Sequence, residues 1–459
     1  MVSYWRFIRG GVGAGFARAV SCVCGAVAIL GATAAVADPP RVVSARPDNG
    51  DTGVDPALAE LRIEFNEDMS PSGMSICGGG AEFPKLAGKP RWDSPRVLIV
   101  PVKLEAEHSY KLSVNCQSFQ NFRNVSGEPA EIYPIAFETG VPGGGKPRAT
   151  LTPEENRKAL AALREAVDEK YSYRDLRKVN WKEAFDNAAK KLEAAETPAQ
   201  FAREAARVLG AARDVHLWLE AGPARFATYE RRYAANYDLG LLMKLVPDWK
   251  ERGANVRSGR FDDGIGYIQI LGWPTERHEA LEPALAALDE LRDAPALVID
   301  VRANGGGDES IAKRFAGRFV TQRAVYSKNV YRDASKPEGF TSPGFDRVVE
   351  PIAPAYAGRV AVLIGPAVLS SNESFVLMMK TSPKVVLVGA ATGGSSGNPK
   401  PTKLGNGVTV WLPSWKDLMP DGTLLEGRGV SPDVRVDGRA AVFEKSDPVL
   451  DAALEELRR

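Results

Sequence analysis

The sequence predicts a multidomain protein with a signal peptide, an all-β sandwich, a small helical region and a layered α/β core. The chain has 459 residues with 44% hydrophobic and 25% charged content, which favours about three globular domains of roughly 150 residues over a disordered or coiled-coil chain. Short strands between turn residues follow the leader, and strands alternate with helices in the last half of the chain.

Residues 1–37 have the features of a secretory signal peptide. Three arginines accompany a short apolar run that ends in Ala-Val-Ala at residues 35–37, and a Pro-Pro pair follows at 39–40. An uncleaved membrane anchor is disfavoured because the run falls short of the ~20 residues that span a bilayer, and a lipid anchor on Cys22 is weaker still. We expect an exported protein, periplasmic or extracellular, with no stable membrane span after signal removal.

The charge balance limits the partners. Removing the signal peptide leaves 56 basic and 58 acidic residues, and such a chain lacks the basic surface on which nucleic-acid binding depends. Three histidines and four cysteines are too few for a convincing zinc site. We therefore expect no nucleic-acid partner, no metal and no cofactor, and the sequence leaves the oligomeric state open.

Residues 38–141 are predicted to form the β-sandwich. Leu61, Ile63 and Phe65 alternate with polar residues, and turns rich in Gly, Pro and Asn separate the short runs. The stretch 46–70, RPDNGDTGVDPALAELRIEFNEDMS, resembles the opening of bacterial immunoglobulin-like domains, which implies a spacer or docking module. In an oxidising compartment the two cysteines left after signal removal, Cys77 and Cys116, are expected to form one disulfide.

A Gly/Pro linker at 142–151 leads to a helical region at 152–225. Thr152 and Thr197 each precede a proline and stand three residues before Glu155 and Gln200, the arrangement of an N-cap with a capping box. The helical region is expected to end at Gly210, and the following AARDVHLWLE to be extended. Residues 226–263 form a connecting segment.

Residues 264–459 are predicted to be the α/β core with a C-terminal helix. Apolar runs predict strands, and amphipathic segments between them predict helices. In such a layered sheet the functional loops follow the ends of the strands. The predicted strands are 264–273, 296–302, 359–365 and 384–389.

Two serine loops compete as nucleophile sites. Gly393-Gly394-Ser395-Ser396-Gly397 fits the G-x-S-x-G pattern, but prolines follow where that motif needs a helix. Ser370 follows a strand and a turn and begins a helix, where a serine often only caps the backbone. Chemistry is favoured because the NH of Ser371 is free there and the helix dipole stabilises an anion.

Other segments could supply the remaining catalytic parts. The Gly305-Gly306-Gly307 loop after a buried strand offers a second backbone donor, so that Ser371 and Gly306 would form the two halves of an oxyanion hole. Of the three histidines, His108 lies in the sandwich and His278 at the start of a solvated helix, which leaves His216 as the base. Glu426 or Asp214 would orient its ring.

The motifs VIDVRANGGG, LSSNESF, VLVGAATGGSSG and EGRGVSPDV occur in the order found in serine peptidase family 41, which the chain resembles over about residues 150–436. The resemblance implies a crotonase-like or ClpP-like core in which Ser370 matches the nucleophile, Glu373 completes the S-x-x-E pattern, and the Ser371 NH with Gly306 or its neighbour matches the oxyanion donors. It also implies a protein or peptide substrate.

The tricorn-core-like branch fits better than the processing peptidases, which use a Ser-Lys dyad, because Ser395 stands at the position of their lysine. His216 and Glu426 match that branch, whereas Val215 replaces the serine that precedes its histidine. The segment 226–263 is too short for a PDZ domain. The resemblance therefore implies an exported serine endopeptidase; the alternatives are a catalytically silent peptide- or apolar-ligand-binding protein on the same fold, and an esterase acting through Ser395.

Overall fold

The computed structural model describes most of the chain beyond the leader. The described residues are 39–116, 119–143, 150–231, 233–274, 281–333, 335–336, 339–438 and 440–459. The predicted signal peptide and His278 lie outside them. Within these ranges, no helix has both the length and the apolar content that crossing a bilayer would take.

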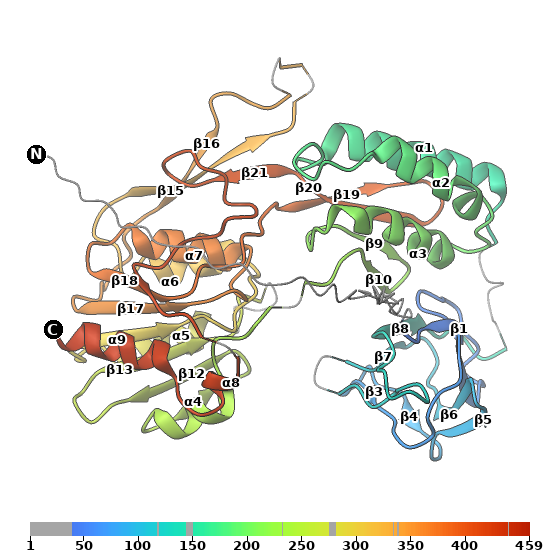
Figure 1. The fold of residues 1–459 in the computed structure, drawn as a ribbon, viewed down its shortest axis with the longest axis horizontal. Helices are drawn as coiled ribbons and strands as arrows, with labels where there is room; N and C mark the ends of the chain where they lie inside the picture. The colour runs from blue at the N-terminus through green and yellow to red at the C-terminus, as the bar shows by residue number, and fades with distance from the viewer. Residues whose placement is uncertain are drawn as a thin grey trace, which may run out of the picture. The chain divides into compact units, whose positions relative to one another are not determined.

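Residues 41–139 fold as β-structure, drawn in blue to teal in Figure 1. Within the described residues, one antiparallel sheet contains β1 (Val42–Arg46), β2 (Glu60–Phe65), β4 (Lys85–Leu86), β5 (Arg91–Ser94) and β6 (Val97–Lys103). A second sheet contains β3 (Ile76–Cys77), β7 (Ser109–Val114) and β8 (Tyr133–Glu138).

The two sheets of this region share one apolar core. Leu61, Ile63 and Phe65 alternate inward on β2 and are at most 1% exposed, as the period-2 pattern predicts. Cys77 and Cys116 form a disulfide with their Cα atoms 6.1 Å apart.

Three helices follow: α1 (Pro153–Lys170), α2 (Trp181–Glu193) and α3 (Pro198–Leu209), with the 3-10 turn η1 (Gly210–Ala212) after them. Thr152 caps α1 with a complete capping box through Glu155. The second predicted capping box is only half formed, because the Gln200 side chain accepts the NH of Glu196 instead of the NH of Thr197. Gly210 ends α3 as predicted.

These helices cover a small antiparallel sheet whose strands come from distant parts of the chain. Its order is β10 (Ala224–Ala227), β9 (Trp218–Ala221), β20 (Val408–Pro413) and β19 (Pro399–Lys403). Leu219, Phe226 and Val410 face the helices and pack into a shared core with them. The predicted helical region is therefore completed by strands from the last quarter of the chain.

The α/β core is built on a mixed sheet. Among the described residues its order is β11 (Lys250–Arg252), β12 (Val256–Arg260), β13 (Gly266–Ile270), β14 (Ala296–Asp300), β17 (Arg359–Ile364), β18 (Val385–Gly389) and β22 (Val434–Arg435). The strands from β13 to β22 run parallel to one another. The strand β12 pairs antiparallel with both of its neighbours, β11 and β13. The sheet thus begins before the predicted boundary at 264, in strands too short and polar to give a clear apolar run.

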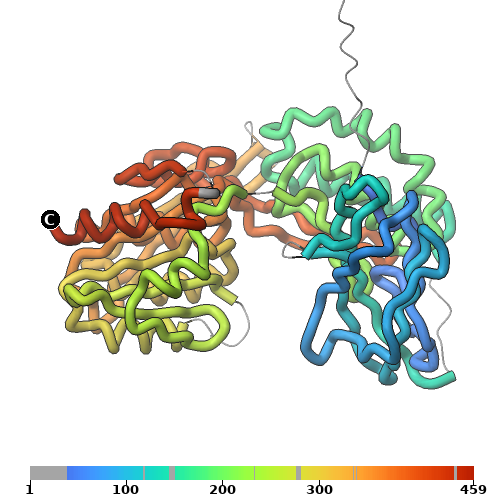
Figure 2. Tube along the Cα trace, turned by 60° about the horizontal axis from the view of Figure 1, so that its bottom comes forward, coloured from blue at the N-terminus to red at the C-terminus, as the bar shows by residue number. Residues whose placement is uncertain are grey.

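Helices cover both faces of this sheet. One apolar core is shared with α5 (Leu281–Glu290), α6 (Glu309–Ala316) and α7 (Ser371–Lys380). The other is shared with α4 (Leu239–Leu245), α8 (Ala440–Phe443) and α9 (Pro448–Arg458). Figure 2 follows the trace from the blue strands of the first region to the red C-terminal helix.

A further sheet lies beside α7. It contains β16 (Phe345–Val349), β15 (Ala324–Tyr331) and β21 (Trp415–Leu418). Because β21 follows β20 after one residue, the chain passes directly from the small antiparallel sheet to this further sheet. The protein is a multidomain mixed α/β protein in which several sheets meet around residues 390–418.

Candidate active site

Ser370 stands between the end of β17 and the first residue of α7. Its backbone has φ 56° and ψ −130°, and its side chain makes no capping hydrogen bond. Positive φ is costly for a residue with a Cβ, and an N-cap serine ordinarily bonds the first-turn donors. Ser370 therefore does not have the ordinary capping role that its position allows, and the strand–turn–helix geometry matches that of a nucleophile elbow.

The glycine loop after β14 lies directly against this serine. Gly306 has φ +115°, and a Cβ placed on it would come within 2.9 Å of the Ser370 Cβ and 3.0 Å of the Leu369 carbonyl. Any side chain at this position would collide with Ser370. The loop thus needs glycine both for its conformation and for its close approach.

Asn372, in the first turn of α7, fixes the loop to the helix. Its amide donates to the carbonyls of Asn304 at 2.9 Å and Val301 at 3.2 Å, and its oxygen accepts the indole NH of Trp273. Trp273 is fully buried and donates its backbone NH to Gly306. One side chain therefore sets the position of the glycine loop relative to Ser370.

The structure also shows where the predicted oxyanion donors point. The NH of Ser371 has no acceptor among the described residues. The NH of Gly306 donates to the side-chain oxygen of Asn304 at 2.9 Å. A ligand oxygen at Gly306 would have to replace that hydrogen bond.

His216 reaches this site through Ser395. Its Nδ1 and the Ser395 hydroxyl share a hydrogen bond of 3.0 Å, and the carbonyl of Ser395 accepts the NH of Ser370 at 2.8 Å. Ser395 therefore touches both predicted catalytic residues. It is 2% exposed, and β19 follows its loop after a short turn, so the loop lacks the helix that a G-x-S-x-G elbow requires.

Glu373 holds the Ser395 loop in place. Its buried carboxylate accepts the Thr392 hydroxyl at 2.5 Å and the NH groups of Gly394 and Ser395, each at 2.8 Å. Burial raises the pKa of Glu373 to about 7, although these three donors oppose the shift. The S-x-x-E spacing thus places Ser370 just before α7 and the Glu373 carboxylate, in the first turn of that helix, against the Ser395 loop.

Asp214, two residues before His216, and Glu426 both form ion pairs with Arg177. Arg177 is 3.1 Å from Asp214 and 2.5 Å from Glu426. Asp214 accepts the backbone NH of His216 at 2.9 Å, and Glu426 accepts the NH of Ser396 at 2.9 Å. Each acid therefore accepts a hydrogen bond from a backbone NH of the site, whereas the imidazole ring hydrogen-bonds the hydroxyl of Ser395.

The segment around His216 is a turn, which corrects the extended conformation predicted for residues 211–217. Leu217 donates its NH to the Asp214 carbonyl at 3.2 Å, and β9 begins only at Trp218. The Asp214 side chain bonds the chain two residues on, as aspartates do in turns. This local bond overrides the apolar alternation.

The buried surroundings also set the protonation of the site. Burial lowers the pKa of His216, and the nearby charges of Arg225 and Arg177 lower it further, while Asp214 opposes them. Burial raises the pKa of Glu426, to which the neighbouring Asp214 adds. A histidine that stays neutral near pH 7 is able to accept a proton.

His108 lies in the β-region, as predicted. Its partly exposed ring hydrogen-bonds the carbonyl of Ala81 and packs on Tyr110. His278 falls outside the described residues. The contacts of Ser395 with His216 and of Arg177 with Glu426 were not predicted, because each connects residues more than 170 positions apart in the sequence.

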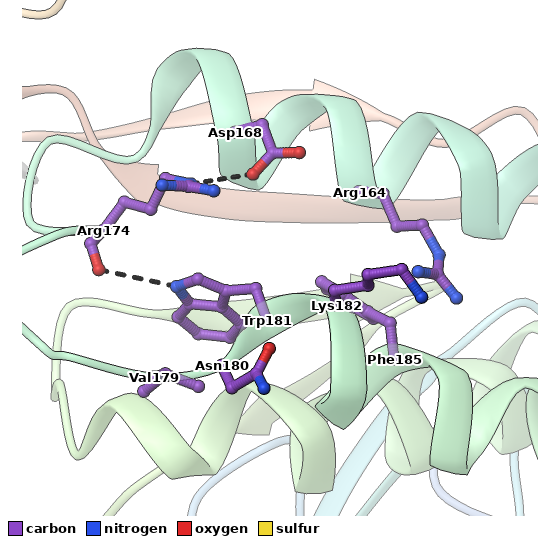
Figure 3. A pocket seen from close by; sticks show the side chains of 8 residues that line it. All are labelled: Arg164, Asp168, Arg174, Val179, Asn180, Trp181, Lys182 and Phe185. Atoms are coloured by element: carbon purple, nitrogen blue, oxygen red, sulfur yellow. Dashed lines mark hydrogen bonds and ion pairs between the residues drawn. The ribbon is translucent and has the colours of Figure 1, made fainter.

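A cavity of about 400 Å³ lies apart from these residues, beside α1 and α2 (Figure 3). Its cations already have acidic partners: Arg174 bonds Asp168, and Arg164 and Lys182 bond Asp186. It contains none of the predicted site residues. The lining residues are Arg164, Asp168, Arg174, Val179, Asn180, Trp181, Lys182 and Phe185.

Part of the chain is similar to known proteins. Residues 264–436 match Peptidase family S41. The carboxy-terminal processing proteases CtpA and CtpB of Bacillus subtilis (strain 168) are 25% and 26% identical over 207 and 172 residues, which cover 45% and 38% of this chain and 41% and 34% of those proteins. The chain thus spans less than half the length of these curated relatives.

A solved structure from Parabacteroides merdae ATCC 43184 shares the fold with a TM-score of 0.57 and 23% identity, covering 67% of this chain and 98% of that one. The fold is shared with this solved structure, and the sequence matches make part of the chain similar to serine-type peptidases. Residues 264–436 are therefore similar to peptidase family S41.

Proposed function

We propose that this chain is an exported serine endopeptidase that hydrolyses peptide bonds in proteins or peptides, with Ser370 as nucleophile and His216 as general base. The observation that carries the proposal is the state of Ser370. Its backbone is strained, its side chain leaves the helix uncapped, and the glycine loop lies so near that a Cβ on Gly306 would collide with the Ser370 Cβ. Strain retained at a helix N-terminus is a feature of nucleophilic serines.

The reaction follows the usual acyl-enzyme course. Ser370 Oγ attacks the peptide carbonyl carbon, its proton passes to Nε2 of His216, and the oxyanion accepts the NH of Ser371. The C–N bond then breaks as His216 returns the proton to the leaving amine. A water molecule, deprotonated by His216, cleaves the ester and regenerates the Ser370 hydroxyl.

The second oxyanion donor comes from the glycine loop. Gly306 is the predicted residue, and its NH is bonded to Asn304 in the absence of substrate. The developing negative charge is a stronger acceptor than an amide oxygen. We therefore infer that the oxyanion takes this hydrogen bond from Asn304 as it forms.

Ser395 supplies the group that orients the imidazole in this mechanism. Its hydroxyl is 3.0 Å from Nδ1 of His216, which leaves Nε2 for the nucleophile. Because Val215 occupies the place of the serine found before the histidine in the tricorn-core-like branch, Ser395 takes that role from another loop. Glu426 and Asp214 act more remotely, through the backbone of Ser396 and of His216.

A second candidate is an esterase in which Ser395 itself attacks, since it is the serine that bonds His216. Burial argues against this role, because a side chain that is 2% exposed cannot easily meet a substrate carbonyl. The NH groups beside Ser395 are also occupied, because those of Gly394 and Ser395 both donate to Glu373. Ser370 has the open donor next to it.

Export is part of the proposal. The signal-like residues 1–37 support it, and the Cys77–Cys116 disulfide is the kind of bond that persists in oxidising compartments. The β-region before the linker would then be an immunoglobulin-like spacer or docking module.

The test is covalent labelling of the purified mature protein by a fluorophosphonate. We expect wild type and Ser395→Thr to be labelled, Ser370→Ala to be unlabelled, and His216→Ala to be labelled at least about a thousandfold more slowly. Peptide mapping should find the adduct on Ser370.

Other outcomes select the alternatives. Equal labelling of wild type and Ser370→Ala would contradict the nucleophile assignment, and an adduct on Ser395 would support the esterase. A folded wild type that is neither labelled nor able to cleave a broad peptide library would favour the binding protein.

A further inference from the structure

The small antiparallel sheet has an aromatic face that the proposed reaction does not use. Trp218 on β9 and Trp411 on β20 stack with ring centroids 5.3 Å apart and an interplanar angle of 14°. The guanidinium carbon of Arg225, on β10, lies 3.9 Å from the centre of the Trp218 ring. We name these three residues the Trp–Arg platform.

The platform lies on the opposite face from the core of that sheet. Leu219, Phe226 and Val410, which alternate with the platform residues, are buried against the helices. The two tryptophans are half-buried and Arg225 is exposed. The sheet does not need these three residues for its core, because its other face already packs on the helices. Stacked indoles and a guanidinium on an accessible face are able to bind a ligand.

The platform adjoins the proposed general base. His216 precedes Trp218 by two residues, so their Cα atoms are at most about 7 Å apart. The charge of Arg225 is also one of the causes that lower the pKa of His216, which agrees with their proximity. A substrate residue near the scissile bond could therefore reach the platform.

Arg225 differs from the other cation at the site. Arg177 is paired with Asp214 and Glu426, whereas no acid of the described ranges makes a salt bridge with Arg225, on which the charge of Glu220 acts without such a contact. Glu220 is its partner in the strand register, but the Glu220 carboxylate accepts the indole NH of Trp218 at 3.1 Å. The guanidinium of Arg225 thus lies against the Trp218 ring, and its NH groups are available to the carboxylate of a ligand.

We propose that the Trp–Arg platform is a substrate subsite that binds a carboxylate-bearing residue of the peptide close to the scissile bond. The tryptophans contact the apolar part of that residue and Arg225 pairs with its carboxylate. The carboxylate comes from an acidic side chain or from the C-terminus of the substrate. This inference rests on the proposed peptidase function and specifies its substrate class.

Binding to the uncleaving Ser370→Ala protein tests the subsite. The probes are four fluorescein-labelled decapeptide mixtures. The central residue is either Glu or Gln, and the C-terminus is either a free carboxylate or a carboxamide. All other positions are random but exclude Asp and Glu. We expect the carboxylate-bearing probes to bind about tenfold more tightly in fluorescence anisotropy, as a charged hydrogen bond provides. Tighter binding of the Glu probes than of the Gln probes would show that a side-chain carboxylate is recognised. Tighter binding of the free C-terminus than of the amidated one would show that the terminal carboxylate is recognised.

Variants on the Ser370→Ala background locate the effect. Arg225→Gln should remove the preference for carboxylate, and Trp411→Ala should weaken every probe by about tenfold. Lys400→Gln is the matched control: Lys400 is an exposed cation on β19 that pairs with Leu412, on the face opposite the platform, and should leave the preference intact.

Two results would overturn the subsite. One is equal binding of carboxylate and amide probes, or no binding of any probe. The other is a preference that Arg225→Gln leaves unchanged in a protein with the circular dichroism of the parent. Fluorophosphonate labelling of the wild type decides the peptidase proposal separately, so Ser370-dependent labelling without a carboxylate preference refutes the subsite alone.

Discussion

The β-region at residues 41–139 and the α/β core use charged residues in opposite ways. In the β-region, ion pairs such as Arg62–Asp93 have side chains 49% and 53% exposed. In the core, Arg302 pairs with Asp300 and Asp447 with exposed fractions of 0 to 1%. The first kind of pair adds little to stability, whereas the second cannot lose a member without leaving a buried charge.

The difference follows from what each region must hold in place. The β-region closes its core with alternating apolar strands and one disulfide. The core must fix polar loops at the ends of its strands, and it does so with buried groups: Arg302 at the end of β14 and Glu373 under the Ser395 loop. The half-buried Arg177 of the helical region adds a cation between two buried acids. Buried charge in this protein therefore marks the loops that carry the proposed chemistry.

The largest expected effect comes from removing one member of a buried cluster. Arg302→Ala leaves Asp300 and Asp447 buried without their cation, and we expect a loss of about 3–5 kcal/mol in the free energy of unfolding, measured from urea denaturation of the α/β core. A loss under about 1 kcal/mol would show that buried pairs do not distinguish the two regions. Asp346→Asn, which alters a half-exposed pair with Lys328, serves as the control.

The disulfide is the corresponding element of the β-region. The double substitution Cys77→Ser with Cys116→Ser should cost about 2–4 kcal/mol, because the bond closes a loop with a sequence separation of 39. Hydrogen exchange should show faster opening confined to the β-strands, while fluorophosphonate labelling of Ser370 keeps its rate. Slower labelling would mean that the two regions are coupled.

The pH dependence of labelling should reflect the burial of His216. Because burial and two arginines lower its pKa below about 6.5, the ring stays neutral to lower pH and the labelling rate falls only below that value. Arg225→Gln removes one of these positive charges, so the pKa should rise and the acidic limb should shift to higher pH. A limb that shifts downward or stays fixed would contradict the placement of Arg225 beside His216.

The smallest effect is expected at the exposed pairs. Arg62→Ala breaks the ion pair with Asp93 at the surface of the β-region, and we expect a change of at most about 0.5 kcal/mol in unfolding free energy. Thermal unfolding of the wild type and the variant at low and high salt measures it. A loss comparable to that of Arg302→Ala would remove the contrast between the regions.

Much of this architecture could be predicted because it depends on neighbours in the sequence. The alternation of Leu61, Ile63 and Phe65 predicted β2, and Thr152 with Glu155 predicted the start of α1. The runs at 296–302 and 359–365 became β14 and β17, a residue or two shorter. Each signal is a side-chain period or a cap, which local backbone geometry converts into structure.

The small antiparallel sheet could not be predicted in the same way. Its strands β9 and β20 are separated by more than 180 residues, and the short segments that form it give no sign of which partner each will find. The same holds for β11 and β12, whose polar residues disguised them as a connecting segment.

The sequence by itself determined the parts of the candidate site: a serine at the start of a helix, a triple glycine after a buried strand and a single well-placed histidine. Only the tertiary structure decided how they meet. It placed Ser395 against both His216 and Ser370, and it stacked Trp218 on Trp411 beside them. Local propensity selects elements one at a time, whereas a hydrogen bond between distant loops exists only once the layers have packed.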